Sequence, residues 1–392
     1  MASPSLTSGA VATLLANPYG IAVTCVVAIV VAAIVVHCAS RGDDDGWKQH
    51  DKLGKIVATV AELYVYPVKS CAGCRVEEAD VSETGLRFDR RFMVVSRRYA
   101  DAGENSDSRL AMVSQREYPR MALVHPELVM EGDQLVALRL TLADCLDGSH
   151  VALKPLVVDV RRLTQPGGDG DDGDDAAAGG APREEVVVWP TDKPDENAKD
   201  AVLVGGPAAS AWFREALRAP AEDAELHLVF MDDRCRRHVA AKFAARAGGG
   251  AGVLQRDACR NSFADVTHYL VVSRASLTDL NARIRRSSSS AGGDTPTSIG
   301  PDRFRPNIVV DGVGAAFEED TWGMVAIIPG GPSSQPRRGR QQQQQQQQRR
   351  GPVEPLFLYG VKNCTRCVIP TTNQVRLVCG CRSFIHRVVG GM

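Results

Sequence analysis

The amino-acid sequence predicts an α+β fold in which one transmembrane helix precedes an N-terminal β-rich domain and a barrel-like β core. Three observations lead to this fold class. Strand-like runs outnumber helix-like runs, two segments carry helical spacing, and one apolar stretch near the N-terminus is long enough to cross a bilayer. The 392 residues, 44% of them hydrophobic, can bury the core of one or two domains.

The apolar stretch, residues 19–38, is predicted to be a transmembrane signal anchor that follows a tail of residues 1–18. All but one of residues 21–36 are apolar, and ~20 such residues span a bilayer. A secretory signal peptide is the alternative, although no Lys or Arg precedes the stretch. The basic residues that follow it, from Arg41 onward, favour a cytosolic position for the rest of the chain.

Strand patterns recur along the chain. Their residues are β-branched or alternate apolar and polar with period two, as in residues 135–142. The predicted strands are residues 63–67, 92–96, 135–142, 151–160, 269–272, 307–310 and 356–361.

Two segments predict helices. In residues 207–217, apolar side chains recur at i,i+4 spacing, as in the pair Trp212 and Ala216. The second helix is expected to begin at Ser276, which forms a capping-box pattern with Asp279. Its apolar face consists of Leu277, Leu280 and Ile284.

Four low-complexity segments are predicted to be solvated loops. They are the acidic insertion 166–185, the Gly/Ala run 247–252, the Ser/Gly/Thr run 287–300, and residues 329–352 with eight consecutive glutamines. The acidic insertion predicts a domain boundary near residue 190. Arginines beside the glutamines are compatible with a nucleic-acid patch, but the net charge of -1 favours solvation, and no nucleic-acid partner is expected.

Two CxxC pairs, Cys71/Cys74 and Cys364/Cys367, are candidates for metal or redox chemistry. A zinc site of four thiolates is disfavoured, because nearly the whole chain separates the pairs instead of the roughly 15–20 residues of a compact ribbon. A thioredoxin-like pair needs a helix start, which residues 368–370 do not provide. A buried structural cysteine remains the default for each thiol.

Basic residues predict an anion site. Lys69 and Ser70 follow a predicted strand, where backbone amides and a hydroxyl can meet an anion. Arg90, Arg116 and Arg120 are candidates for bidentate phosphate contacts, although each alone is more typical of a surface charge. The chain lacks a Walker-A loop and a GxGxxG motif. The ligand is therefore expected to carry phosphate without being identified as a nucleotide.

The runs LYVYPVKSCAG, GLRFDRRFMVV and SQREYPRMALV resemble the N-terminal domain of the molybdenum-cofactor-sulfurase C-terminal (MOSC) proteins. The later runs FADVTHYLVVSRASLTDLNARI, RFRPNIVVDG, EEDTWG and NCTRCVIPTTNQ are similar to the MOSC domain itself, particularly in the mitochondrial amidoxime reducing components. The resemblance covers most of residues 19–374 outside the low-complexity loops. It implies a MOSC N-terminal β-barrel-like domain at 56–190 and a MOSC domain with a β-barrel core at 201–374.

The resemblance implies a molybdenum–molybdopterin cofactor whose metal is held by Cys367, the second cysteine of its pair; thiolate ligands suit this metal. The residues that match cofactor contacts are Lys69, Ser70 and Arg90 for the pterin and its phosphate, and Thr267, Arg305, Asn307 and Thr365 in the second domain. Arg305 and Asn307 also fit a turn that enters a strand, and Cys364 also fits packing. Pyridoxal phosphate, which is associated with such domains, is not expected here.

The activity implied is reduction of N-hydroxylated compounds such as amidoximes and hydroxylamines. The chain has no NAD or flavin fingerprint, so the resemblance implies electron delivery by cytochrome b5 and its NADH-dependent reductase. It also implies the outer mitochondrial membrane, with the catalytic domain in the cytosol. A cofactor-binding or carrier protein without turnover is the alternative.

Residues 375–392 carry none of the family's pattern and are interpreted as an aberrant tail. The hypothesis is translation into unspliced sequence after Gln374, because valine codons begin with the bases that usually start an intron. Sequencing of the transcript across this codon tests it.

Overall fold

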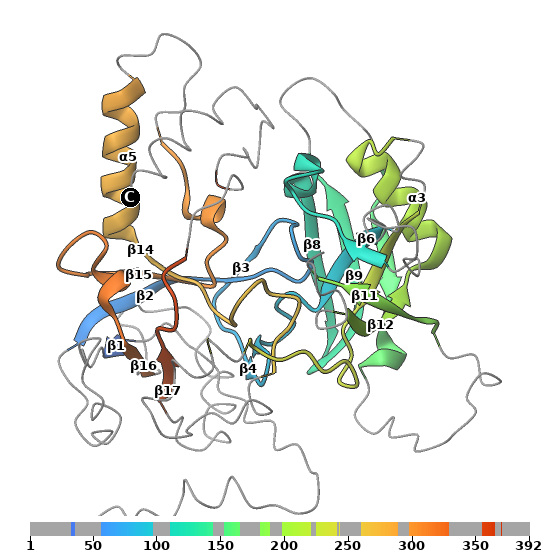
Figure 1. The fold of residues 1–392 in the computed structure, drawn as a ribbon, viewed down its shortest axis with the longest axis horizontal. Coiled ribbons are helices and arrows are strands. Elements are labelled where there is room, and N and C mark those ends of the chain that lie inside the picture. The colour runs from blue at the N-terminus through green and yellow to red at the C-terminus, as the bar shows by residue number, and fades with distance from the viewer. Residues whose placement is uncertain are drawn as a thin grey trace, which may run out of the picture.

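The computed structural model describes both predicted helices and most of the predicted strands. The residues described are 33–35, 56–96, 110–143, 153–164, 181–188, 198–220, 225–240, 243, 260–288, 298–328, 355–364 and 370. Figure 1 shows a barrel with helix α3 at one end of the molecule and a larger sheet with helix α5 at the other. The predicted strand-dominated fold is confirmed for these residues, and a closed barrel is formed by strands between residues 92 and 230. The β-barrel core expected within residues 201–374 stays a prediction, because the described strands after residue 270 belong to a seven-stranded sheet.

Five strands close into the barrel in the order β11-β12-β13-β6-β7. They are β6 (Phe92–Ser96), β7 (Leu110–Met112), β11 (Arg183–Val187), β12 (Ala198–Val204) and β13 (Leu226–Phe230). β6 is buried on both sides because its side chains alternate between two clusters. Met93 and Val95 pack in one cluster, while Phe92 and Val94 pack in the other, where the ring of Phe92 lies 4.8 Å from that of Phe230.

Helix α3 (Gly206–Leu217) confirms the predicted helix at 207–217 and covers the second cluster. A three-stranded sheet of β8 (Val124–Glu131), β9 (Gln134–Leu142) and β10 (Leu156–Asp159) packs against the same cluster. The indole of Trp212 donates to the carbonyl of Lys154 at 2.9 Å, which joins the helix to the segment before β10. Gly132, at φ +60°, supplies the left-handed residue of the tight β8–β9 turn.

Seven strands form the other sheet, with β2 near its centre. The order is β14-β15-β2-β1-β16-β17, with β3 paired to β2. The strands are β1 (Ala33–Val35), β2 (Ile56–Val65), β3 (Cys74–Val76), β14 (Val271–Ser273), β15 (Ile308–Asp311), β16 (Met324–Ile328) and β17 (Leu356–Tyr359). β4 (Val81–Ser82) pairs with β5 (Gly85–Leu86), and α5 spans Arg274–Ser288. Short 3-10 helices are η3 (Pro119–Leu123), η4 (Arg161–Leu163), η9 (Pro301–Phe304) and η10 (Glu318–Thr321).

The predicted transmembrane helix at 19–38 requires correction. Ala33–Val35 forms strand β1, which pairs antiparallel with β2 and β16, and the other residues of the stretch lie outside the described ranges. A run rich in valine and isoleucine meets the requirements of a buried strand as well as those of a membrane helix, so composition could not separate them. Neither described α-helix combines the length and hydrophobicity that a bilayer crossing requires.

Two other boundaries differ from the prediction. β11 and β12 lie on either side of residue 190 and pair with each other, so the boundary expected there falls inside the barrel. The last residues of the predicted loop 166–185 begin β11, because Arg183 pairs with Asp200 and Asp232 across the neighbouring strands. The remaining limits of the two predicted domains stay a prediction.

Helix α5 begins one turn earlier than expected. Ser273 accepts a hydrogen bond from the backbone N–H of Ser276 at 3.1 Å and so caps the helix. The hydroxyl of Ser276 instead donates to Glu319 at 2.7 Å. The predicted apolar face is confirmed, because Leu280 and Ile284 are buried in one cluster and Leu277 packs against it. Of the predicted loops, residues 247–252 and 329–352 lie outside the described ranges, as do the tail segments 1–18 and 375–392.

Candidate functional site

The candidate site begins where β2 ends. Pro67 lacks the N–H that would continue the strand, and the backbone turns toward β6 instead. The N–H of Lys69 donates to the carbonyl of Phe92 at 2.8 Å, and the N–H of Phe92 donates to Pro67 at 3.0 Å. The N–H of Arg90 donates to the carbonyl of Tyr66 at 2.7 Å. These bonds hold the segment after β2 beside the segment that enters β6.

Asn307 joins this region to the strand β15. Its side-chain N–H groups donate to Asp89 at 3.0 Å and to the carbonyl of Tyr64 at 3.2 Å. Its oxygen accepts from Arg90 at 3.1 Å and from the N–H of Leu270 at 3.3 Å. Asn307 is fully buried, and both the N–H groups and the oxygen of its side-chain amide form hydrogen bonds. It therefore fixes the position of Arg90 as well as the start of its own strand.

Two guanidinium groups lie over the buried ring of Tyr66. Arg305 is 4.5 Å and Arg90 5.0 Å from the ring centroid, within the range of cation–π contacts. Arg305 also donates to the carbonyl of Cys71. Burial and the positive charge of Arg90 lower the pKa of Arg305, while the ion pair with Asp89 outweighs burial and raises the pKa of Arg90. A β-carbon at Gly73 would overlap the Tyr66 ring, so this position requires glycine.

Lys69 adds a third cation. Its buried ammonium donates to the carbonyl of Phe263 at 2.8 Å and pairs with Asp265. Burial lowers the pKa of Lys69 to about 8, although Asp265 opposes this effect. Burial also works against the charge of Asp265, but Lys69 outweighs it and lowers the pKa of Asp265 to about 2. Arg237 supports the same loop by donating to the carbonyl of Ala264 at 2.6 Å.

Three of the predicted cofactor contacts have a left-handed backbone. The φ angles are 66° for Ser70, 52° for Arg90 and 58° for Arg305, all at non-glycine residues. Such conformations cost of order 1–3 kcal/mol each and cluster at functional sites. The network around Tyr66 and Asn307 maintains them.

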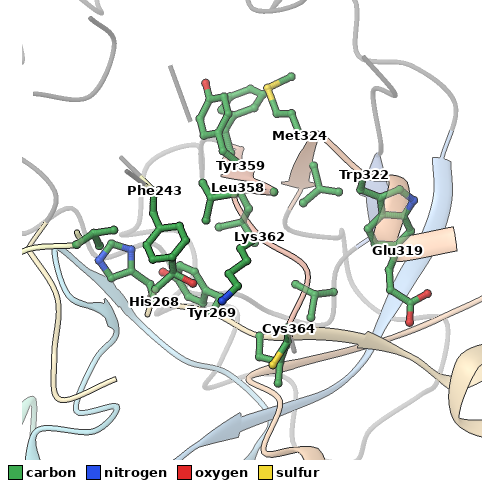
Figure 2. Close-up of a pocket in the computed structure, with 18 of the residues that line it drawn as sticks. Phe243, His268, Tyr269, Glu319, Trp322, Met324, Leu358, Tyr359, Lys362 and Cys364 are labelled. Carbon is green, nitrogen blue, oxygen red and sulfur yellow. The ribbon is translucent and has the colours of Figure 1, made fainter. Parts of the chain in front are cut away.

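A pocket of about 390 Å³ adjoins this region (Figure 2). Thr267, two residues after Asp265, lies on its wall together with His268 and Tyr269. The opposite wall comes from β16, β17 and the loop that follows β17, which ends in the described chain at Cys364. The pocket therefore lies between the loop bound by Lys69 and the chain that leads to Cys367.

The structure brings most of the predicted site residues together. Lys69, Arg90, Arg305 and Asn307 belong to one network, and Ser70 lies beside Lys69 with its carbonyl bound by Gln115 at 2.7 Å. Thr267 borders the pocket. Thr365 and Cys367 lie outside the described residues, so their roles stay predictions.

Arg120 is buried, and its Nε donates to the carbonyl of Ala216 at 2.8 Å, which ties η3 to α3. Its phosphate contact stays a prediction. Arg116, by contrast, is close enough for its charge to lower the pKa of Asp265. In the described part of the chain, no three His, Cys, Asp or Glu side chains are placed to hold a metal ion.

Sequence reasoning missed Tyr66, Asp89 and Asp265. The first two lie within the quoted motifs, and an aspartate directly before Arg90 is a visible signal of an ion pair. Asp265 pairs with Lys69 although 196 positions separate them in the sequence, and a local sequence pattern cannot predict such a pair.

The charge balance of the network fits an anionic group such as a phosphate. Lys69, Arg90 and Arg305 are matched here by the carboxylates of Asp89 and Asp265, of which Asp265 is half-exposed. Buried cations without full compensation are costly, and a phosphate would supply the missing charge. The buried hydroxyl of Tyr66 has no hydrogen-bond partner among the described residues. The donor set therefore fits the phosphate of a pterin cofactor.

Comparison with known families agrees with this geometry. The MOSC N-terminal beta barrel domain matches residues 57–220, and the MOSC domain matches residues 259–376. The chain is a MOSC-domain protein. The first match extends past residue 190, in line with the barrel that β12 and β13 complete.

Relatives of this MOSC-domain protein include amidoxime reducing components. It is 27% identical to mitochondrial amidoxime-reducing component 1 of Mus musculus, over 81% of this chain and 66% of that protein. It is 25% identical to mitochondrial amidoxime reducing component 2 of Homo sapiens, over 72% of this chain and 64% of that protein. It is 22% identical to molybdenum cofactor sulfurase of Solanum lycopersicum, over 68% of this chain and 26% of that protein. The chain thus spans just under two thirds of the first two relatives. These relatives indicate a function related to the molybdenum cofactor.

Proposed function

We propose that this MOSC-domain protein is a molybdenum-cofactor-dependent reductase of N-hydroxylated compounds. The observation that carries the proposal is the convergence of Lys69, Arg90 and Arg305 beside a pocket whose lining includes Cys364, the first cysteine of the second CxxC pair. The names of the amidoxime reducing relatives support the substrate class.

The cationic network would hold the phosphate end of molybdopterin. Lys69 and Ser70 follow β2, Arg90 precedes β6 and Arg305 precedes β15, so three segments would bind one anion. Asn307 positions Arg90, and Thr267 borders the pocket from the loop that Lys69 binds. Thr365 and the metal ligand Cys367 complete the proposed set. When bound, the cofactor supplies the two-electron, oxygen-atom chemistry.

The reaction breaks the N–O bond of the substrate and requires two electrons and two protons, with water and the reduced nitrogen compound as products. The chain's share is to orient the substrate in the pocket through the aromatic and polar side chains that line it. The proposed electron donors are cytochrome b5 and its NADH-dependent reductase. The names of the relatives also support a mitochondrial location.

The test is NADH-dependent reduction of benzamidoxime by the purified chain mixed with both electron carriers. Reduction that requires all three proteins and is lost in Cys367→Ala supports the proposal. Bound molybdopterin without turnover would instead favour a cofactor carrier, which is the second candidate function. Absence of molybdenum from protein expressed where the cofactor is abundant would refute both functions.

A further inference from the structure

The pocket that adjoins the cationic network has several aromatic and aliphatic side chains in its walls, together with polar and charged ones. Figure 2 shows Trp322, Met324, Leu358 and Tyr359 on one side, and Phe243, His268 and Tyr269 on another. These side chains come from the residue after η10, from β16 and β17, from the segment before β14, and from the single described residue at position 243. Aromatic side chains bind flat rings through stacked or edge-to-face contacts. The walls therefore fit an aromatic ligand better than a flexible polar one.

The ammonium of Lys362 is placed to bind an anionic group in this pocket. Its nitrogen lies 5.6 Å from the centre of the Phe243 ring, and Figure 2 shows the side chain directed to the part of the pocket where Phe243, His268 and Tyr269 lie. Among the described residues no carboxylate forms an ion pair with it. A cation–π contact leaves the three N–H donors of a lysine available to an anion.

Each carboxylate that lines the pocket has at least one interaction, although Oε2 of Glu319 is buried without a hydrogen-bond partner among the described residues. Glu319 accepts from the N–H of Ser273 at 3.0 Å and from the hydroxyl of Ser276 at 2.7 Å. Glu83 accepts from Arg260 at 3.1 Å. Asp320 also has an interaction of its own. The ammonium of Lys362 is thus the charged group best placed to recognise a ligand.

We infer that this pocket selects flat aromatic substrates that carry a carboxylate, which pairs with Lys362. The inference rests on the proposed function in one respect, namely that the pocket receives the compound to be reduced. Cys364 lines the same pocket, two residues after Lys362 and three before Cys367. A ring held against Phe243 and Tyr269 with its carboxylate on Lys362 would therefore lie in the pocket that Cys364 lines.

The experiment compares two probes that differ by one carboxylate group: benzamidoxime and 4-carboxybenzamidoxime. Binding to the purified full chain is measured by calorimetry, without an electron donor. A hydrogen-bonded ion pair in a partly desolvated pocket predicts that the carboxylated probe binds about tenfold more tightly. Quenching of tryptophan fluorescence gives a second readout, because Trp322 lines the pocket.

The variant Lys362→Met is expected to remove this difference while it leaves the affinity for the neutral probe unchanged within about twofold. Lys362→Arg retains the positive charge and should retain the preference. Lys154→Met, at an exposed lysine on the barrel side of the molecule, serves as the matched control and should behave like the parent. Because Lys362 is exposed, its substitution is expected to leave the fold intact, which circular dichroism can verify.

Equal binding of the two probes by the parent chain would overturn the inference, and so would a preference that survives in Lys362→Met. The outcome is separate from the proposed reductase activity. A lysine-dependent preference without turnover would uphold the inference and count against the reductase. Turnover of benzamidoxime without any preference for the carboxylated probe would support the reductase and overturn the inference about Lys362.

Discussion

The side-chain amide of Asn307 donates to the carboxylate of Asp89 at 3.0 Å, although 218 positions separate the two residues. Asp89 in turn accepts from the N–H of Tyr66 at 2.8 Å and pairs with Arg90. One buried amide thereby holds together the end of β2, the start of β6 and the start of β15.

Replacement of Asn307 by alanine should therefore destabilise the protein. The change leaves several buried groups without partners, and each costs about 1–3 kcal/mol. We expect a loss of about 3 kcal/mol in the free energy of unfolding, measured by denaturant titration. Asn281→Ala is the matched control. The side-chain amide of Asn281 donates to the carbonyl of Ile299 and accepts from its N–H, but Asn281 is less buried than Asn307. Equal losses in the two variants would contradict the role assigned to Asn307.

Ser70 offers a test of backbone strain. Its φ of 66° disfavours a side chain, so Ser70→Gly should raise the free energy of unfolding by up to about 1 kcal/mol. Ser70→Ala keeps the β-carbon and should not gain this stability. Both variants lose the hydroxyl and should bind inorganic phosphate less tightly than the parent, as measured by calorimetry. If the alanine variant were stabilised as much as the glycine variant, strain would not be the cause.

Asp265 should make stability depend on pH at the acid end. The ion pair with Lys69 lowers the pKa of Asp265 to about 2 from an ordinary value of 3.8. The unfolded chain binds a proton at higher pH than the folded chain, so this contribution is present above about pH 4 and is lost as the pH falls toward 2. Asp265→Asn removes the titrating group, and its melting temperature should fall less over this window than that of the parent.

The control for this prediction is Asp200→Asn, whose carboxylate pairs with Arg183 at 2.6 Å on the barrel. Below pH 4, the melting temperature of this variant should change with pH as much as that of the parent, even if the two melting temperatures differ by a constant amount. A slope that Asp265→Asn leaves unaltered would show that the Lys69 pair does not contribute.

The two cysteines of the second pair should respond differently to substitution. Cys367→Ala is expected to lose the activity and the molybdenum–sulfur bond, while part of the cofactor is retained through the phosphate contacts of Lys69 and Arg90. Cys364→Ala, at an exposed thiol on the wall of the pocket, should retain molybdenum. Metal analysis and pterin fluorescence of the purified variants measure the two quantities. Retention of stoichiometric molybdenum by Cys367→Ala would exclude this residue as the ligand.

Local patterns predicted the elements whose side chains repeat strongly. The i,i+4 spacing of Trp212 and Ala216 located α3, and the period-two pattern of residues 135–142 located β9. The cap of α5 was misplaced by one turn, because Ser273 and Ser276 are both suitable residues. They differ in that the Ser273 hydroxyl accepts from a helix N–H, whereas the Ser276 hydroxyl donates to Glu319. Strand β1 was missed for a related reason: Val and Ile satisfy a membrane helix and a buried strand alike.

The candidate site was predicted only in part. Its cations stand in recognisable motifs, and the structure places Lys69, Arg90 and Arg305 together. The carboxylate that meets Lys69 could not be predicted, because Asp265 arrives from a distant loop without periodicity. The aromatic pocket was also unforeseen, since its walls come from segments that become neighbours only when the large sheet has formed.

The position of β2 has a consequence for biosynthesis. This strand is synthesised early, yet its partner β15 follows only after more than half of the chain, with Leu63 aligned opposite Ile308. The barrel strands between them can associate while the ribosome is still translating the rest. β1 and β3 can also pair early along one edge of β2, whereas the other edge must wait for β15. A nascent chain stalled before β15 should therefore recruit chaperones at its N-terminal end, and release of the finished polypeptide should relieve that dependence.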